Sequence, residues 1–355
     1  MYNISKVISK INLTKGYKIS RILKGGWQLA GGHGAIDKKQ AVGDMFKFAE
    51  AGITTFDFGD IYIGVEELVG QFIKEYTNQF GKARINDIQL NTKLVPDVDI
   101  LPTISKQYVE KIIDRSLRRL GVESLDLVQF HWWDYDIKRY LQVAYYLVDM
   151  QTKGKIRYIG VTNLDVPRLA ELVENRIPIV SNQVQYSVLD HRPENGMVAF
   201  CQQHNIKLLC YGTAAGGFMS SRYLNVREQI PPYENRSLTK YKLIIDEFGG
   251  WGLFQELLSV LNRIAKKHNV SITNVASRYV LDKPQVAGII IGARNIDHLE
   301  ANKKVFEFNL DQEDKKSIQV VVNKSTGPKG DTYFLERIKN GKHASIMKYN
   351  LNKER

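Results

Sequence analysis

Cysteine is scarce in this sequence, with only Cys201 and Cys210 among 355 residues. Two cysteines cannot form the disulfide framework that stabilises small secreted domains, and they suit a reducing compartment. We therefore expect a chain that folds on its hydrophobic core alone and resides in the cytoplasm.

Long apolar runs are also missing. No stretch approaches the roughly 18 apolar residues that a membrane-spanning helix needs, which predicts that the chain does not cross a membrane. Residues 1–10 contain no continuous apolar block followed by a small-residue cleavage site, which argues against secretion. These residues are basic, and no acidic residue occurs before Asp37, which leaves a mitochondrial-type leader as an alternative.

Several signatures of common enzyme classes are absent. Gly32-His33-Gly34 lacks the third glycine and the spacing of a dinucleotide-binding fingerprint, and the chain has no P-loop. The seven histidines and two cysteines show no metal-ligand spacing, and no Gly-x-Ser-x-Gly sequence occurs. The sequence therefore predicts no metal site, no Rossmann-type cofactor site and no serine hydrolase triad.

Acidic residues are in the minority, because 38 of them face 50 lysines and arginines, for a formal net charge of +12. The basic residues are spread along the chain with a modest excess in residues 324–355. No stripe of basic and aromatic residues accompanies them, so we expect no nucleic-acid partner. The charge predicts a solvated basic surface that attracts anionic small molecules.

Apolar, β-branched segments alternate with amphipathic segments along most of the chain. The expected strands are 19–29, 54–59, 88–94, 125–132, 156–163, 179–187, 207–213 and 286–293. Helical spacing of apolar residues is clear in 38–51, 105–120, 139–153, 194–204 and 253–268. Strands that alternate with helices indicate parallel βαβ units, and eight units without a linker favour one closed (β/α)8 TIM barrel.

The sequence divides into an N-terminal segment (1–18), a barrel (19–308) and a basic C-terminal tail (309–355). The first segment is expected to form a hairpin that turns at Lys15-Gly16 and closes the barrel floor. Residues 214–252 contain Gly-Gly and Pro-Pro pairs and are expected to be a long functional loop. Part of the tail could fold back over the barrel top, which its sequence alone does not show.

Four polar residues fall at the ends of adjacent expected strands. The second strand ends in Asp57 and leads to Tyr62, the third ends in Lys93, and the fourth ends around His131. In a (β/α)8 barrel the C-terminal ends of the strands carry the chemistry. One rim of the barrel is therefore expected to hold a carboxylate, a phenol, an amine and an imidazole.

The order of these residues resembles the catalytic tetrad of the aldo-keto reductase superfamily. The likeness covers roughly residues 19–308 and includes the segments 160–163, 182–186 and 292–302. It implies hydride transfer between a nicotinamide cofactor and the carbonyl group of a small-molecule substrate. The catalytic residues that it implies are Asp57, Tyr62, Lys93 and His131.

Carbonyl reduction needs a proton donor aimed at the developing alkoxide. A free phenol has a pKa of about 10, and we expect the Lys93 ammonium to lower the pKa of Tyr62, the general acid. Asp57 is expected to pair with Lys93 and hold it in place. His131 is expected to hydrogen-bond and orient the substrate oxygen.

The resemblance also implies where the cofactor binds. The contacts to the nicotinamide and its carboxamide would be Thr162, Asn163, Gln183 and Tyr211. The other contacts would be Gly26, Trp27, Gln28, Gly217, Phe218, Arg222, Gly292, Ala293, Arg294, His298 and Asn302. A helix that begins near Asn295 would offer amides to a phosphate. Arg294 would pair with a 2′-phosphate, which favours NADPH and leaves NADH as the alternative.

The substrate pocket is expected to contain Trp27, Trp132 and Phe218. Trp132 and Trp133 alternate if the strand continues, so at most one of them faces the pocket. Such a wall favours aromatic or medium-chain aldehydes over sugars. Two alternatives stay open: an NAD(P)-dependent sugar dehydrogenase, and a cofactor-sensing regulatory subunit similar to the channel β-subunits that share this fold.

Overall fold

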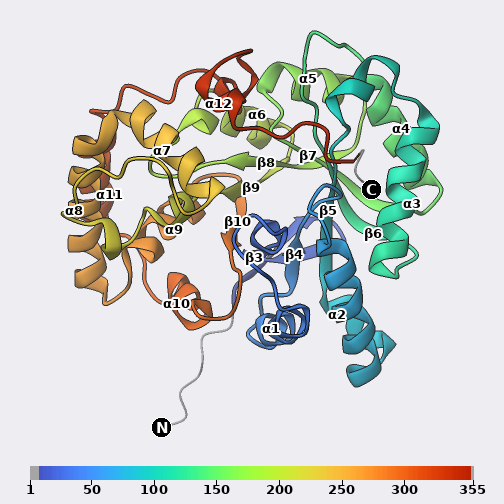
Figure 1. The fold of residues 1–355 in the computed structure, drawn as a ribbon, viewed down its shortest axis with the longest axis horizontal. Coiled ribbons are helices and arrows are strands. Elements are labelled where there is room, and N and C mark those ends of the chain that lie inside the picture. Colours follow the sequence, from blue (N-terminus) through green and yellow to red (C-terminus); the bar gives the residue numbers. More distant parts are fainter. Residues whose placement is uncertain (1–7, 353–355) are drawn as a thin grey trace.

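The computed structural model describes residues 8–352. Eight parallel strands close a barrel in the order β10-β3-β4-β5-β6-β7-β8-β9, and helices surround it (Figure 1). The strands are β3 (Ile22–Gly25), β4 (Thr55–Asp57), β5 (Gln89–Leu94), β6 (Leu125–Phe130), β7 (Ile156–Thr162), β8 (Ile179–Gln185), β9 (Lys207–Tyr211) and β10 (Val286–Gly292). Each lies within one of the eight expected strands, so the predicted barrel is confirmed.

Helices follow the strands and place their apolar faces on the barrel. They are α1 (Lys38–Glu50), α2 (Val65–Phe80), α3 (Lys106–Leu120), α4 (Tyr140–Thr152), α5 (Val166–Glu174), α6 (Met197–Gln203), α7 (Arg236–Phe248), α8 (Gly250–His268), α9 (Ile272–Leu281), α10 (Leu299–Lys303), α11 (Gln312–Val322) and α12 (Lys342–Ser345). Side-chain caps fix several of their starts. Asp37 accepts from the backbone N–H of Gln40 at 3.0 Å, and Ser271 forms a capping box with Asn274.

Residues 214–252 are not the continuous loop that the sequence predicts, because α7 occupies the second half of them. Asn235 caps this helix by accepting from the backbone N–H of Leu238 at 3.1 Å. Leu238, Ile245 and Phe248 lie on its buried face. The Pro231-Pro232 and Gly249-Gly250 pairs flank the helix, and they gave the whole stretch the appearance of a loop.

A hairpin closes the bottom of the barrel. Its strands β1 (Lys10–Thr14) and β2 (Tyr17–Ser20) are antiparallel, as the sequence predicts. The hairpin and the barrel interior share one apolar cluster: Leu13, Tyr17, Ile19, Leu23, Leu127, Leu209 and Ala287. The Tyr17 hydroxyl also donates to Asn91 Oδ1 at 2.6 Å.

Alternation along β5 decides which side chains enter the barrel. Thr92 points outward and donates to Glu66 on α2 at 2.9 Å. Asn91 and Lys93 therefore point inward, with Lys93 nearer the C-terminal end of the strand. Lys93 lies beside Gln129 of β6 in the sheet register, so polar side chains from neighbouring strands meet at the top.

The segment assigned to a basic tail contains α11, which packs against α8, and then crosses the C-terminal rim of the barrel. Figure 1 shows this red segment running from the α11 side to the β5 side of the rim. Glu336 pairs with Arg192 at 2.9 Å, and Asn352 donates to the Val95 carbonyl at 2.8 Å. These contacts make the tail a roof over the upper end of the barrel.

Two helix glycines give a matched test of this packing. A Cβ on Gly70 of α2 would lie 2.1 Å from the Arg119 carbonyl oxygen, whereas a Cβ on Gly43 of α1 would meet no atom within 4 Å. We expect Gly70→Ala to lower the free energy of unfolding by about 2 kcal/mol, because the helices must move apart. Gly43→Ala should leave it unchanged or raise it by up to about 1 kcal/mol. Denaturant titration measures both, and equal effects would contradict this packing.

Candidate active site

The carboxylate of Asp57 is the centre of a polar network inside the top of the barrel, where its residue is 3% exposed. Lys93 Nζ donates to its Oδ1 at 2.6 Å. Gln129 Nε2 and Gln183 Nε2 both donate to its Oδ2 at 2.7 Å, and Gln183 also donates to Gln129 Oε1 at 2.7 Å. One ammonium and two amides therefore compensate the buried charge.

Lys93 connects this network to Tyr62. Its Nζ lies 5.2 Å from the centre of the Tyr62 ring and also donates to the Phe58 carbonyl at 2.7 Å. Burial alone would lower the pKa of Lys93, but Asp57, Tyr62 and Asp60 together outweigh burial and raise it. Lys93 is therefore a stable cation beside the phenol.

The pKa of Tyr62 moves in the direction opposite to the expected one. Burial raises it above the ordinary value for a phenol, and Asp57 and Asp60 add to the rise. Lys93 pulls the pKa down, as expected, but by less than burial raises it. Tyr62 consequently keeps its proton at neutral pH and is available as a proton donor.

His131 is 2% exposed and follows β6. Its Nδ1 lies 3.1 Å from the Thr162 carbonyl oxygen. A carbonyl oxygen only accepts, so Nδ1 carries the proton and Nε2 presents a lone pair. Burial, and to a lesser extent the Arg337 charge, lower the pKa of His131 to about 3.

The expected hydrogen bond of His131 to the substrate oxygen stays a prediction, and the tautomer decides its direction. Its Nε2 is buried and has no hydrogen-bond partner among residues 8–352. In the neutral ring that nitrogen accepts hydrogen bonds. The group that His131 can bind is a hydroxyl, such as that of an alcohol.

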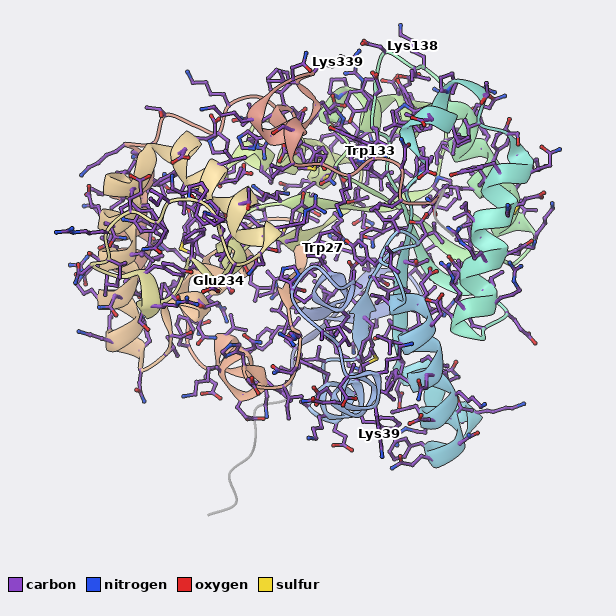
Figure 2. All side chains as sticks on the ribbon, in the orientation of Figure 1. Trp27, Lys39, Trp133, Lys138, Glu234 and Lys339 are labelled. Atoms are coloured by element: carbon purple, nitrogen blue, oxygen red, sulfur yellow. The ribbon has the colours of Figure 1, made fainter. Side chains whose placement is uncertain are left out.

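Aromatic rings adjoin both Tyr62 and His131. The Trp27 ring lies 5.1 Å from the Tyr62 ring, edge to face, and the Trp133 ring lies 4.3 Å from His131. Trp133 also donates from Nε1 to the Pro96 carbonyl at 2.9 Å. Figure 2 shows Trp27 and Trp133 toward the middle of the molecule, well away from Lys39 on α1.

Two residues expected in the substrate pocket are not there. Trp132 is fully buried and points away from His131, because neighbouring residues alternate, and its Nε1 donates to the Asp134 and Ile137 carbonyls. Phe218 is also fully buried, and its ring lies 4.7 Å from that of Tyr223 and 6.2 Å from that of Phe254. Hydrophobic packing holds both side chains in the core.

The residues expected to hold the carboxamide do converge. Tyr211 donates from its hydroxyl to Asn163 Oδ1 at 2.7 Å. No residue in the described range 8–352 bonds to Asn163 Nδ2 or Gln183 Oε1. The Asn163 amide nitrogen is therefore free to donate a hydrogen bond, and the Gln183 amide oxygen is free to accept one. A carboxamide offers the matching acceptor and donor, so these two side chains fit the group. The Thr162 hydroxyl donates to the Gln183 carbonyl oxygen at 3.2 Å.

The residues expected near the phosphates are spread along the segments after β9 and β10. Gly217 ends a short 3-10 turn, and Arg222 forms an exposed ion pair with Glu234 at 2.8 Å. Arg294 donates to the carbonyls of His33 and Ala35, at 3.0 and 2.8 Å. It therefore ties the loop after β3 to the segment after β10.

The expected helix start near Asn295 is wrong. Asn295 accepts from the Asp297 backbone N–H at 3.2 Å in a turn, and α10 begins only at Leu299. His298 caps this five-residue helix, and Asn302 lies within it.

The cofactor contacts expected at the end of the first barrel strand, β3, lie next to the end of the last strand, β10. Gly26 precedes the short 3-10 turn that contains Trp27 and Gln28. A Cβ on Gly292 would lie 2.4 Å from Gln28 Nε2. Ala293 follows at the end of β10 and is buried.

Comparison with known proteins settles the family. A model of the aldo/keto reductase family matches residues 21–323. This chain belongs to that family. As an aldo-keto reductase it is an oxidoreductase that acts on carbonyl and alcohol groups.

Individual relatives of this aldo-keto reductase are distant in sequence but similar in length. Aldo-keto reductase YhdN of Bacillus subtilis is 26% identical over 330 residues, covering 90% of this chain and 95% of the relative. An aryl-alcohol dehydrogenase of Pestalotiopsis microspora is 25% identical, covering 82% and 74%. The holo structure of aldo-keto reductase AKR11C1 from Bacillus halodurans is 26% identical with a TM-score of 0.69, covering 88% and 96%.

Sequence reasoning missed three residues of this reductase site. Gln129 lies two residues before His131, and that spacing alone would have placed it on the same inward face. The ring of Tyr333 lies 5.6 Å from His131, and Arg337 donates to the carbonyls of Trp132 and Asn163, both at 2.9 Å. Both come from the tail, where no local pattern signals a contact with the barrel.

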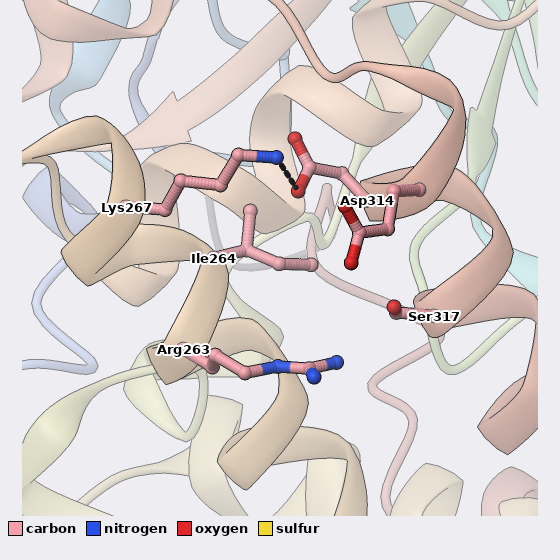
Figure 3. Close-up of a pocket in the computed structure, with 6 residues that line it drawn as sticks. Arg263, Ile264, Lys267, Asp314 and Ser317 are labelled. Atoms are coloured by element: carbon pink, nitrogen blue, oxygen red, sulfur yellow. Dashed lines mark hydrogen bonds and ion pairs between the residues drawn. The ribbon is translucent and has the colours of Figure 1, made fainter.

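A small hollow of about 100 Å³ lies between α8 and α11, away from the tetrad (Figure 3). Lys267 and Asp314 form an ion pair across it at 2.9 Å, and His268 adds a second contact to Asp314. These bonds satisfy the charged groups and connect two helices. Within residues 8–352 no metal-binding cluster of His, Cys, Asp and Glu occurs, and no helix is suited to crossing a membrane.

Proposed function

We propose that this aldo-keto reductase reduces aldehydes and ketones with NADPH, and that Tyr62 is the proton donor. The observation that carries the proposal is the buried ion pair of Lys93 with Asp57, 2.6 Å long, beside the Tyr62 ring. A protonated phenol next to a fixed ammonium is the arrangement that carbonyl reduction requires.

A bound nicotinamide cofactor would supply the hydride. Tyr62 donates its hydroxyl proton to the carbonyl oxygen as negative charge develops there. The phenolate that remains lies beside Lys93, which stabilises it, while Asp57 keeps Lys93 charged and in place.

His131 acts after the proton has moved. Its Nε2 lone pair can accept a hydrogen bond from the hydroxyl of the product alcohol. A ketone or aldehyde carries no such hydrogen, so this contact favours the alcohol over the carbonyl compound. His131 therefore supports the reductive direction while it stays neutral.

Asn163 and Gln183 would hold the carboxamide, and Tyr211 would support the ring from one face. Arg294 would pair with the 2′-phosphate that distinguishes NADPH from NADH. Its guanidinium already binds two backbone carbonyls, and a phosphate oxygen would add a charged acceptor to the same group.

The substrate class that we propose is aromatic or medium-chain aldehydes. Trp27, Trp133 and Tyr333 surround Tyr62 and His131 with apolar rings. Buried apolar surface stabilises a complex by about 25 cal/mol per Å², and an unpaired sugar hydroxyl costs about 1–3 kcal/mol. We also propose a cytosolic location, which the two buried free thiols of Cys201 and Cys210 support.

Tyr62→Phe removes the proposed donor with little change in shape. We expect NADPH-dependent reduction of benzaldehyde to fall at least 100-fold, with the NADPH dissociation constant within about twofold of wild type. Lys93→Met should act similarly, because the phenolate loses its cation. Steady-state kinetics and fluorescence titration measure the two quantities.

Tyr145→Phe on exposed α4 is the matched control and should change neither quantity. Turnover by Tyr62→Phe within threefold of wild type would remove Tyr62 from the mechanism. A panel with pentoses and hexoses tests the substrate class, and a sugar favoured tenfold over benzaldehyde would contradict it.

Arg294→Ala tests cofactor choice. We expect the NADPH dissociation constant to rise about tenfold and that of NADH to change less than twofold, because a charge-assisted bond of about 1.5–3 kcal/mol is lost only with the 2′-phosphate. Lys304→Ala, an exposed cation nearby, is the control. If the ratio of the two constants is the same in Arg294→Ala and wild type, another residue binds the phosphate.

A further inference from the structure

Lys240 on α7 has an ammonium group without a polar partner. Its Nζ lies 4.9 Å from the ring centre of Tyr211, 5.7 Å from that of Tyr333 and 5.8 Å from that of Tyr241. Within the described part of the chain it forms no hydrogen bond and no ion pair. Three tyrosine faces attract the charge, but its three N–H donors remain unused.

Lys242, two residues further along the helix, is a lysine of the same helix whose ammonium has ion-pair partners. Its Nζ pairs with Glu228 at 2.8 Å and with Asp246 at 2.5 Å. The unused donors of Lys240 are therefore a property of its position and not of α7 as a whole.

The acidic groups nearest to Lys240 are already paired. Glu336 and Asp190 both bind the buried guanidinium of Arg192, at 2.9 and 2.7 Å. Burial lowers the pKa of Lys240, Arg192 lowers it too, and Glu336 and Asp190 partly oppose these effects. Lys240 balances the charge of this group, because the two carboxylates face two cations, but neither carboxylate bonds to the Lys240 ammonium.

The tyrosine rings around Lys240 connect it to the catalytic residues. Tyr211 bonds to Asn163 at 2.7 Å, and the ring of Tyr333 lies 5.6 Å from the ring of His131. The Tyr333 ring therefore lies 5.7 Å from the Lys240 ammonium and 5.6 Å from the His131 ring, whose Nε2 has no partner in residues 8–352. The two distances set an upper limit on the span between the ammonium and the imidazole, and a substrate with one aromatic ring and a substituent at each end is of the size that could bridge it.

A cavity of about 320 Å³ adjoins the same face of α7. Its lining comes from α7 and the tail: Arg236, Thr239, Ser345, Ile346, Met347 and Lys348. Two of these side chains are cationic and none is acidic. Arg236 and Lys240 are four residues apart on one helix and so share a face, which gives an approaching anion a continuous basic path.

We propose that Lys240 binds a carboxylate of the carbonyl substrate, so that the substrates are aldehydes or ketones with an anionic group at the far end of an aromatic ring. The proposal rests on the reductase function proposed above and specifies its substrate. A charge-assisted hydrogen bond from Lys240 to the carboxylate would hold the other end of the ring toward Tyr62 and His131.

The test compares 4-formylbenzoate with 4-formylbenzamide, which match in size and differ in charge. We expect the wild-type chain to favour 4-formylbenzoate at least tenfold in kcat/KM with NADPH. Lys240→Met should reduce that ratio at least tenfold, and Lys240→Arg should retain most of it. Lys39→Met, an exposed lysine on α1, removes the same charge elsewhere and should leave the ratio unchanged.

Calorimetric binding to the NADP⁺-loaded protein supplies a readout independent of turnover. We expect 4-(hydroxymethyl)benzoate to bind wild type more tightly than Lys240→Met by at least tenfold, with no such difference for 4-(hydroxymethyl)benzamide. Circular dichroism at the assay temperature shows whether each variant is folded. If the methionine variant is not, Lys240→Gln removes the same charge and carries the test.

Three outcomes would overturn the proposal. The wild-type chain could reduce the benzamide as well as the benzoate, which leaves the reductase function intact but removes the anion preference. Lys240→Met could weaken NADPH binding tenfold without changing the substrate ratio, which assigns the ammonium to a cofactor phosphate. Reduction of neither compound, nor of benzaldehyde, would instead reject the reductase function itself.

Discussion

The carboxylate of Asp57 receives hydrogen bonds from Lys93, Gln129 and Gln183, and these donors come from three other strands of the barrel. An unpaired buried carboxylate is strongly destabilising, so the strand ends are held in the one arrangement that satisfies it. The same arrangement places Lys93 beside Tyr62. The hairpin floor supports it from below, since Tyr17 bonds to Asn91 under the network. Both the stability of the strand ends and the chemistry proposed for Tyr62 thus depend on the Asp57 carboxylate.

Burial decides the protonation states around that charge. It raises the pKa of Tyr62 and lowers the pKa of His131 to about 3, so both groups are neutral over the physiological range. The tail contributes to the burial of His131. Glu336 binds Arg192, and that contact brings Tyr333 and Arg337 over His131. The tail is therefore part of the candidate active site, although it lies some 200 residues from His131 in sequence.

The barrel and the tetrad could be predicted because their signals are local. Each strand is a short apolar run, and Asp57, Tyr62, Lys93 and His131 occur within recognisable motifs. Other features depend on contacts between distant segments. Alternation along the strand predicts that at most one of Trp132 and Trp133 faces the pocket. Which of the two it is became known only from the structure. Burial raises the pKa of Tyr62 by more than Lys93 lowers it. Phe218 packs in the hydrophobic core, and the Thr162 carbonyl fixes the tautomer of His131. None of these effects has a signature in the adjacent sequence.

The central claim is that burial keeps both Tyr62 and His131 uncharged beside the Lys93 cation. The most direct test is the pH dependence of kcat/KM for reduction of an uncharged aldehyde, measured between about pH 5 and pH 9 with NADPH. The account predicts a flat profile, because His131 titrates near 3 and Tyr62 above its ordinary value. A transition with an apparent pKa of about 6.5 that disappears in His131→Asn would contradict it.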